Sequence, residues 1–484
     1  MLYGMILLPA AMGLFCAFTG DGQRRLRRAV LLTGQIVLLG LAGYAALTGQ
    51  DYATPVWHMT ETITFSLRLD GVGILYCCLT AFCWLLTIPY ADVYMPHEGG
   101  EPRFYAFLFT TEAAVMGAAL AADFMTLYLF FELTTVLSAP LVLHQQHDKA
   151  LLGASKYVYY SIGGAFLALF GITVLQQHCA SLAFVAGGSL LPGHDTPLVL
   201  AAVFCAMVGF GAKAGLYPLH NWLPSAHPAA PAPASALLSG IIAKCGALAI
   251  LRLIYFVVGP EAIRGTWVQT AALVLTTLTI AVGSYMGCME WELKKRLAYS
   301  SISQISYVLL GLFLLTERGV MGGMLQLFFH ALAKTAIFQA AGAVILLTGN
   351  TRIDQFRGLG RRMPLTMLCF TVVSLSLVGI PPFGGFWSKW YLATAALAAA
   401  PGALGYVIPA VLILSALLTA GYLSQPIISA FFPGQDCPEE LLSPVDEPPA
   451  MMTSLVIFAA LSGLLGFAPN VVLSLMEKLA SYVL

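Results

Sequence analysis

The sequence predicts an all-α integral membrane protein with about fourteen transmembrane helices. Hydrophobic residues make up 59% of the 484-residue chain and charged residues only 10%, whereas a soluble protein carries roughly 25% charged residues. The apolar residues gather in repeated stretches of about 20 residues, which matches the thickness of a bilayer core. The formal net charge is zero, so there is no electrostatic reason to expect a nucleic-acid partner.

The apolar stretches define the predicted spans in order. The first begins at the N-terminus without the basic segment and cleavage site of a signal peptide, so we expect it to be retained as a helix. The spans cover residues 2–19, 28–48, 70–90, 104–121, 124–143, 153–175, 198–219, 235–258, 268–287, 297–315, 320–348, 364–400, 404–432 and 451–476.

Two of these spans contain helix breakers. The seventh is interrupted after Lys213 by Gly215 and Pro218, and the twelfth by the sequence PPFGG at 381–385. Backbone groups at a break inside the membrane must be satisfied by protein or by cavity water. A pair of broken helices in corresponding places is typical of an ion or substrate site, so we expect such a site here.

Lysine spacing indicates an internal repeat. Lys156 and Lys334 are 178 residues apart, and Lys213 and Lys389, at the two broken helices, are 176 apart. A nearly constant offset indicates a duplicated unit of five helices, and an odd number of helices makes the second copy inverted. The predicted organisation is N-terminal helices 1–3 (1–103), a first repeat of helices 4–8 (104–258), a second repeat of helices 9–13 (268–432), an acidic loop (433–449) and helix 14 (450–484).

Lysine and arginine counts predict the orientation. Loops that follow odd-numbered helices hold 13 basic residues, whereas loops that follow even-numbered helices hold only Arg68, Arg264 and Arg318. The positive-inside rule then places the odd loops, including the acidic loop 433–449, on the cytoplasmic side of the cell's inner membrane. Both termini are expected outside.

Few ionisable residues fall inside the spans. A charge at the bilayer centre costs about 2.5–3.5 kcal/mol, so these side chains must face the bundle interior, pair with one another or contact water. Such residues are functional candidates on a proton or ion pathway. They are Glu112, Glu132, Lys156, Lys213, Lys244, Arg252, Lys334 and Lys389.

The central pair is predicted to be Glu132 with Lys213. Loss of hydration disfavours the charged form of a buried lysine, and a nearby carboxylate favours it. A Glu–Lys pair that forms and breaks would therefore load and release a proton. The structural alternative is that Glu132 only neutralises a lysine.

Further relay candidates follow along the chain. Lys244 is the next, and Lys389 is a candidate outlet; His330 and Lys334 share one helical face at i and i+4, and the lysine's charge would help keep the histidine neutral. Arg252 does not deprotonate in practice, so a structural ion pair or snorkelling is expected for it.

Four other positions stay open. Lys156 is either a relay residue or a helix-end anchor, and His220 and His227 serve either gating or interfacial packing. Glu112 has no partner that the sequence identifies. The ten cysteines are scattered without a CxxC pair, so no metal centre or other cofactor is expected.

Several segments resemble the antiporter-like subunits shared by respiratory complex I, Mrp-type sodium/proton antiporters and energy-converting membrane-bound hydrogenases. The resemblance covers about residues 60 to 430 and is strongest to the D-type Mrp subunit and its hydrogenase relatives. Its sequence signatures appear in the family's order: FFELTT around Glu132, AKAGLYPLHNWLPSAHPAAPAPASALLSG at 212–240, IIAKCGALAILR, KKRLAYSSISQISYVLLG, FHALAKTAIF and GIPPFGGFWSKW.

The resemblance implies a function and partners. It implies a fourteen-helix fold with inverted repeats in helices 4–8 and 9–13, and protons moving along a central hydrated polar axis. The family's key residues fall on Glu132, Lys213, Lys244, His330, Lys334 and Lys389. It also implies neighbouring homologous subunits and small membrane subunits, with a hydrogenase or other iron–sulfur module in some complexes. Glu112 matches no family residue, and the middle antiporter-like subunit of complex I typically has glutamate where Lys389 stands.

Three other functions are alternatives to proton translocation within a complex. A redox enzyme subunit that binds its own quinone, flavin or metal lacks support, because no nucleotide-binding glycine fingerprint is present. A scaffold would use the buried charges only to hold helices together, and a free-standing carrier would work without partners. The proton-pumping subunit of a complex-I-type NADH or quinone oxidoreductase is the alternative within the family.

Overall fold

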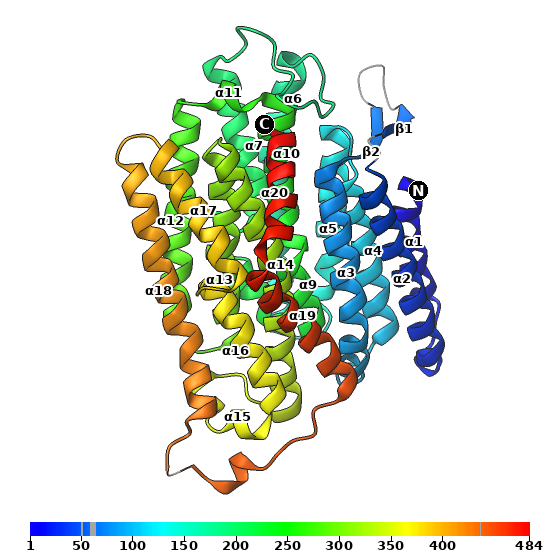
Figure 1. Cartoon of the computed structure of the whole chain (residues 1–484). Coiled ribbons are helices and arrows are strands. Elements are labelled where there is room, and N and C mark those ends of the chain that lie inside the picture. Colours follow the sequence, from blue (N-terminus) through cyan, green and yellow to red (C-terminus); the bar gives the residue numbers. More distant parts are fainter. Residues whose placement is uncertain (50–51, 59–63, 436) are drawn as a thin grey trace.

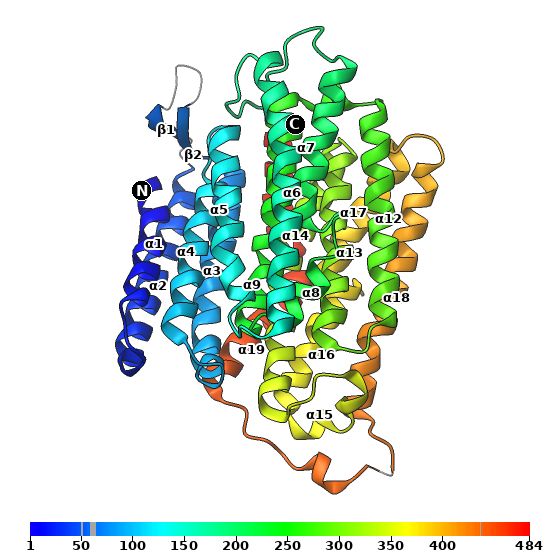
Figure 2. The same cartoon turned by 180° about the vertical axis from the view of Figure 1, so that it is seen from behind.

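Helices occupy every predicted span of the chain. The computed structural model describes residues 1–49, 52–58, 64–435 and 437–484, and Figures 1 and 2 show its helices aligned in one upright bundle. The helices of the N-terminal half are α1 (Leu2–Ala17), α2 (Arg24–Thr48), α3 (Gly71–Tyr94), α4 (Glu101–Ala119), α5 (Phe124–Val142), α6 (Asp148–His178), α7 (Pro197–Ala214), α8 (Leu223–Ala229), α9 (Ala232–Gly240) and α10 (Cys245–Arg252).

The C-terminal half continues the bundle. Its helices are α11 (Pro260–Ile263), α12 (Trp267–Met289), α13 (Leu293–Phe313), α14 (Glu317–Thr348), α15 (Leu359–Arg362), α16 (Pro364–Val378), α17 (Gly384–Ala399), α18 (Leu404–Phe431), α19 (Pro449–Phe467) and α20 (Pro469–Val483). Short 3-10 turns lie at η1 (Asp21–Gln23), η2 (Met95–His97), η3 (Ile242–Lys244), η5 (Ile353–Phe356) and η6 (Glu439–Leu442), and η4 (Leu253–Val258) is π-helical.

The membrane character of the bundle is confirmed. In the described part of the chain, ten helical segments are long and apolar enough to cross a membrane. They are α2, α3, α5, α6, α7, the run from α9 to η4, α12, α14, α18 and α19. The other predicted spans are filled by α1, α4, α13 and the pair α16–α17.

Both predicted helix breaks are present. Helix α7 ends at Gly215 (φ 82°) and α16 at Gly379 (φ 84°), and both glycines adopt the left-handed conformation that caps a helix C-terminus. The chain then continues into α8 and α17. These breaks therefore stop each helix inside the bundle, as the breaker residues predict.

Two further breaks were not predicted. The span expected at 235–258 is divided into α9, η3 and α10, with Lys244 at the end of η3. The last span is divided between α19 and α20 at Ala468–Pro469. The break in the last span carries Gly466 and Pro469 at the same spacing as Gly215 and Pro218, so a signal for it was present in the sequence. The break at Lys244 has no such signal, because no proline lies between residues 234 and 259.

The prediction of a helical membrane fold is confirmed, and the structure adds one small β hairpin to it. Strands β1 (Tyr52–His58) and β2 (Thr64–Leu69) form an antiparallel hairpin between α2 and α3, in which Ala53 pairs with Arg68 and Thr54 with Leu67. The hairpin lies at the end of the bundle where Figure 1 places both termini. Alternating side chains in β2 bury Leu67 and Leu69 against the helices.

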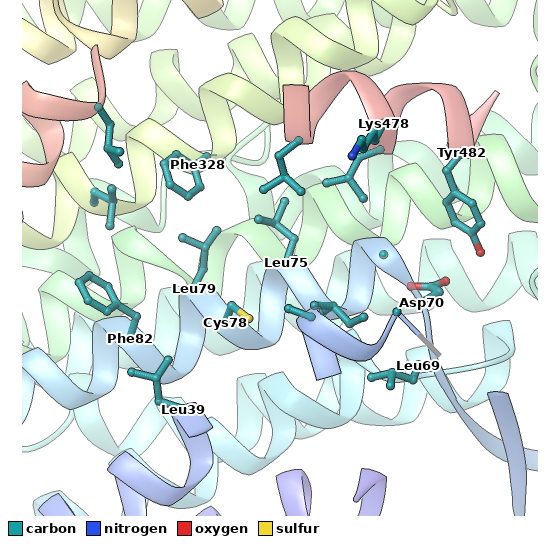
Figure 3. Close-up of a pocket in the computed structure, with 18 of the residues that line it drawn as sticks. Leu39, Leu69, Asp70, Leu75, Cys78, Leu79, Phe82, Phe328, Lys478 and Tyr482 are labelled. Carbon is teal, nitrogen blue, oxygen red and sulfur yellow. The ribbon is translucent and has the colours of Figure 1, made fainter. Parts of the chain in front are cut away.

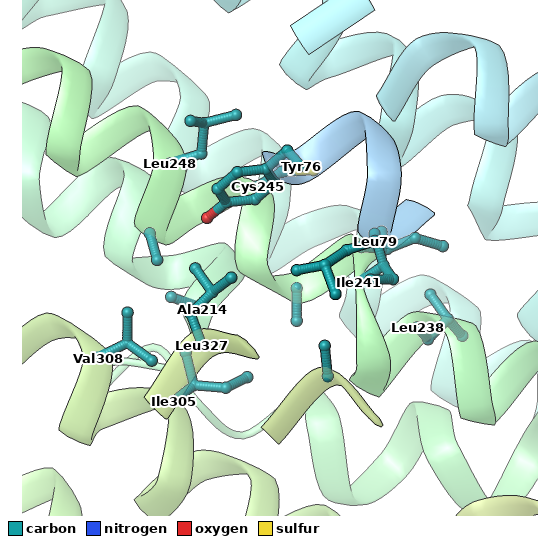
Figure 4. Close-up of a cluster of buried hydrophobic side chains, with 14 of the residues drawn as sticks. Tyr76, Leu79, Ala214, Leu238, Ile241, Cys245, Leu248, Ile305, Val308 and Leu327 are labelled. Carbon is teal, nitrogen blue, oxygen red and sulfur yellow. The ribbon is translucent and has the colours of Figure 1, made fainter. Parts of the chain in front are cut away.

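Helix α14 forms the centre of the bundle. It is buried along almost its whole length and packs against α9, α13, α16, α17 and α19. Leu327 of α14 and the other labelled side chains of Figure 4, which include Ala214, Ile241 and Ile305, form a buried apolar cluster. Polar groups in this region must therefore find their partners within the protein.

Candidate functional site

The predicted central pair meets at one turn of α5, which carries Glu132 and accepts the hydrogen bonds of Lys213 from α7. The ammonium of Lys213, in the last turn of α7, donates to Phe131 O at 3.0 Å, to Thr135 Oγ1 at 2.8 Å and to Thr134 Oγ1, and lies 4.5 Å from the centre of the Phe131 ring. Within the described residues Lys213 forms no ion pair, and the buried Glu132 Oε1 has no hydrogen-bond partner. Glu132 and Lys213 are thus close neighbours, but they do not form a salt bridge.

Lys244 lies at the unpredicted break between α9 and α10. Its ammonium donates to Ser239 O at 2.8 Å and to Gly240 O at 2.5 Å. These are the last carbonyls of α9, which have no partner within the helix. The break therefore supplies the acceptors that the buried lysine requires.

A polar connection leads from Lys244 to Lys334 across three helices. The hydroxyl of Ser239 on α9 hydrogen-bonds to that of Ser301 on α13 at 2.7 Å. Ser301 Oγ donates to Leu297 O at 3.0 Å, and Lys334 Nζ on α14 donates to the same Leu297 O at 3.0 Å. The two buried lysines thus donate to backbone carbonyls, Ser239 O and Leu297 O, at the two ends of the Ser239–Ser301 hydroxyl pair.

A second polar cluster surrounds Lys389. Its ammonium donates to Leu377 O at 2.6 Å and Val378 O at 2.5 Å, the last carbonyls of α16. Gln304 Nε2 on α13 also donates to Leu377 O, at 3.4 Å. Gln304 Oε1 in turn accepts from Gln326 Nε2 at 2.7 Å.

One face of α14 joins the two clusters. Gln326, His330 and Lys334 follow one another at i, i+4 and i+8, so they share that face. Both ring nitrogens of His330 are buried without a hydrogen-bond partner in the described residues. His330 therefore lies between the Gln304–Gln326 cluster and the Ser239–Ser301 connection.

We call the buried polar residues from Glu132 and Lys213 to Lys389 the axis. His227 lies beside it, which the sequence did not indicate. Its ring stacks on Phe338 with 4.8 Å between the ring centres, and Lys334 Nζ lies 5.9 Å from the centre of that same ring. Both ring nitrogens of His227 are buried without a partner among the described residues. His220 instead is half-buried in the turn after α7 and stacks on Tyr217.

The remaining ionisable candidates lie away from the axis. Lys156 donates to Ser225 Oγ of α8 at 3.3 Å, which joins α6 to the segment after the first break. Glu112 is fully buried and accepts from Gln35 Nε2 of α2 at 2.5 Å. The structure thus identifies Gln35 as the partner of Glu112.

Arg252 forms a buried ion pair. Its guanidinium donates to both carboxylate oxygens of Asp70, at 2.6 and 2.8 Å, and lies between the rings of Phe184 and Phe256. Asp70 also caps α3 by accepting from Gly73 N at 2.8 Å. This arrangement supports the structural interpretation of Arg252.

Sequence reasoning missed the neutral members of the axis. Ser239, Ser301, Gln304 and Gln326 are not ionisable, so a search for buried charges passes over them. A signal was nevertheless present, because α13 and α14 carry serine and glutamine at helical spacing among apolar residues. Lys294 and Arg296 fall between the predicted spans 268–287 and 297–315, where a loop is expected, whereas both are buried in the first turn of α13.

A family model decides the relationship to known proteins. The model described as "NADH:quinone oxidoreductase/Mrp antiporter, TM" matches residues 121–419, which include every member of the axis. The chain belongs to this family. The antiporter-like resemblance expected from the sequence signatures is therefore confirmed.

The relatives of the chain include an oxidoreductase subunit and an antiporter subunit. The N subunit of the NADH-quinone oxidoreductase of Desulforudis audaxviator is 34% identical over 417 residues, which cover 84% of this chain and 80% of that protein. The D-type subunit of the Na(+)/H(+) antiporter of Alkalihalophilus pseudofirmus is 30% identical over 386 residues, covering 79% and 76%. A chain of the Mrp complex from a Dietzia species superposes with a TM-score of 0.87 at 22% identity, covering 100% of this chain and 97% of that one.

Proposed function

We propose that this chain is a proton-translocating subunit of a multisubunit membrane complex, of the Mrp antiporter D type or the energy-converting hydrogenase type. The observation that carries the proposal is the polar connection from Lys244 through Ser239 and Ser301 to Lys334. It crosses an otherwise apolar core, where unneeded polar groups are costly.

The proposed route uses the sequence candidates together with the neutral groups. Protons enter near Glu132 and Lys213, pass Lys244 and reach the α14 face with His330 and Lys334. Lys389 is the outlet. Hydroxyl groups both donate and accept, whereas backbone carbonyls only accept, so the serines can pass a proton and water must carry it past the carbonyls.

The test is proton transport by the purified native complex in liposomes that hold a pH-sensitive dye. Lys213→Ala should abolish transport, and Ser301→Ala should slow it at least several-fold, with recovery in Ser301→Thr. The matched control is Ser306→Ala, because the Ser306 hydroxyl only donates to Ile302 O on the same helix. Transport that is normal in both Lys213→Ala and Ser301→Ala complexes would contradict the route.

The partners and the driving force form a second part of the proposal. The relatives include both an antiporter subunit and a quinone oxidoreductase subunit, so we propose homologous antiporter-like subunits and small membrane subunits as neighbours. Purification of the native complex in mild detergent, followed by mass spectrometry of its subunits, distinguishes an antiporter complex from a redox-driven complex. Small Mrp-type subunits alone indicate an ion-gradient-driven antiporter. A hydrogenase, an NADH module or another iron–sulfur module indicates a redox-driven pump, the complex-I-type alternative included.

The orientation completes the proposal. The basic segments at 24–28 and 352–362 lie at one end of the bundle, opposite both termini (Figure 1). By the positive-inside rule, this basic end faces the cytoplasm and the termini face outside.

A further inference from the structure

A large cavity lies between α2, α3, α14, α19 and α20. Its volume is about 660 Å³, within the range of about 300–1,000 Å³ that is usual for ligand pockets. Helices α2, α3, α14, α19 and α20 all contribute side chains to it (Figure 3). None of the ionisable residues on the proposed proton route lines this cavity.

The lining is apolar except at one end. Figure 3 places Lys478, Tyr482 and Asp70 together at one side, whereas Phe82 and Phe328 lie at the other. A cavity of this kind matches a molecule with a polar head and a hydrocarbon tail.

The charge at the polar end is positive. Asp70 is neutralised by its buried ion pair with Arg252. Lys478 is exposed on α20, and the Tyr482 hydroxyl accepts a hydrogen bond from Arg68 at 3.2 Å. An anionic phosphate is the head group that complements this end.

The length of the cavity corresponds to one leaflet. The lining residues of α3 run from Gly71 to Phe82, which spans about 17 Å at about 1.5 Å per residue. Half of a hydrocarbon core of about 30 Å is about 15 Å. A transmembrane helix of a partner would be about 10 Å wide and cross both leaflets, so the cavity matches a single acyl chain better.

We propose that this cavity binds a phospholipid, with one acyl chain along α3 from Leu75 to Phe82 and the phosphate at Lys478. The lipid belongs to the leaflet at the end of the bundle that holds both termini. The site is independent of the proton route, so failure of one proposal leaves the other standing.

Photo-crosslinking tests the site directly. The full native complex is placed in nanodiscs that contain a small fraction of phosphatidylglycerol with a diazirine in the middle of one acyl chain. After illumination and digestion, mass spectrometry should find the label on residues 74–82, although Leu75 and Leu79 are only 7% and 5% exposed. Leu79→Trp, which fills the cavity, should remove this label. It should leave unchanged any labelling of the α18 surface around Leu417, which is exposed on this chain.

The lysine variants test recognition of the phosphate. Lys478→Ala should lower the labelling of residues 74–82 about fivefold, as expected for about 1 kcal/mol from one lysine near the membrane surface. Lys478→Arg should retain it. The site is refuted if residues 74–82 stay unlabelled, or if a peptide of a partner subunit is crosslinked there instead. Equal labelling by a diazirine diacylglycerol, which has no phosphate, would refute recognition of the head group.

Discussion

Lysine side chains along the axis are held by neutral oxygen atoms. Lys213, Lys244, Lys334 and Lys389 all donate to backbone carbonyls, and Lys213 donates to two threonine hydroxyls as well. Within the described residues, none of the four forms an ion pair. A neutral amine still has two N–H donors, which are enough for the acceptors of Lys244, Lys334 and Lys389, whereas Lys213 would lose one of its three bonds on deprotonation. Such a site can therefore exist in both protonation states without stranding a carboxylate.

The contact between Glu112 and Gln35 gives a prediction at the same scale. Glu112 Oε2 and Gln35 Oε1 are both buried without a partner among the described residues, and an acid proton between them would satisfy both. Glu112→Gln can keep this exchange of hydrogen bonds and should retain stability. Glu112→Leu leaves Gln35 Nε2 with only its bond to Ala81 O, at 3.0 Å, and leaves Gln35 Oε1 without a donor, so it should lower the free energy of unfolding by about 1–3 kcal/mol. Unfolding of the full chain in mixed micelles measures the difference, and equal stability of the two variants would argue against the pair.

At the scale of elements, helix breaks and lysines occur together. The last carbonyls of α9 accept from Lys244, and the last carbonyls of α16 accept from Lys389. A helix C-terminus leaves carbonyls unpaired and carries the negative end of the helix dipole. Each break thus creates a local site for a cation inside the membrane. This explains why Lys244 and Lys389 can be buried although neither forms an ion pair with a carboxylate in the described part of the chain.

Gly379 tests the role of the second break. An added Cβ at this position would lie 2.9 Å from Lys389 Cδ and 3.0 Å from its Nζ, and the residue has φ 84°. Gly379→Ala should cost about 1–3 kcal/mol of stability for the left-handed backbone and displace the Lys389 ammonium, so proton transport should fall. Gly421→Ala is the matched control, since its Cβ would meet no atom within 4 Å. Transport assays and unfolding of both variants measure the two effects, and unchanged transport in Gly379→Ala would remove Lys389 from the route.

At the scale of the whole molecule, the fold separates two kinds of charge. Surface ion pairs, such as Arg28 with Asp92 and Lys295 with Glu290, lie at the basic end. The lysines of the axis lie deep in the bundle around α14. Charges in loops set the orientation of the protein in the membrane, whereas charges inside the bundle are candidates for a proton pathway.

The proposed orientation can be measured with cysteine variants. Asp195→Cys, in the loop between α6 and α7, should react with a membrane-impermeant maleimide in intact cells. Asp354→Cys, in η5 at the basic end, should react only after the membrane is permeabilised. Both are made with Cys437 replaced by serine, because that native thiol lies in the acidic loop. The reverse pattern of labelling would place the termini in the cytoplasm.

Composition and residue pattern by themselves determined the membrane class, the span positions, the two glycine-capped breaks and the buried ionisable residues. These follow from the bilayer, which demands long apolar helices and makes every buried charge conspicuous. Only the tertiary structure decided which groups meet. The Ser239–Ser301 contact, the Gln35–Glu112 pair and the break at Lys244 depend on side chains from helices far apart in sequence, or on carbonyls that only the folded backbone exposes. A neutral serine or glutamine does not stand out in an apolar span as a charged residue does, so the partners of these groups can be identified only from the packed helices.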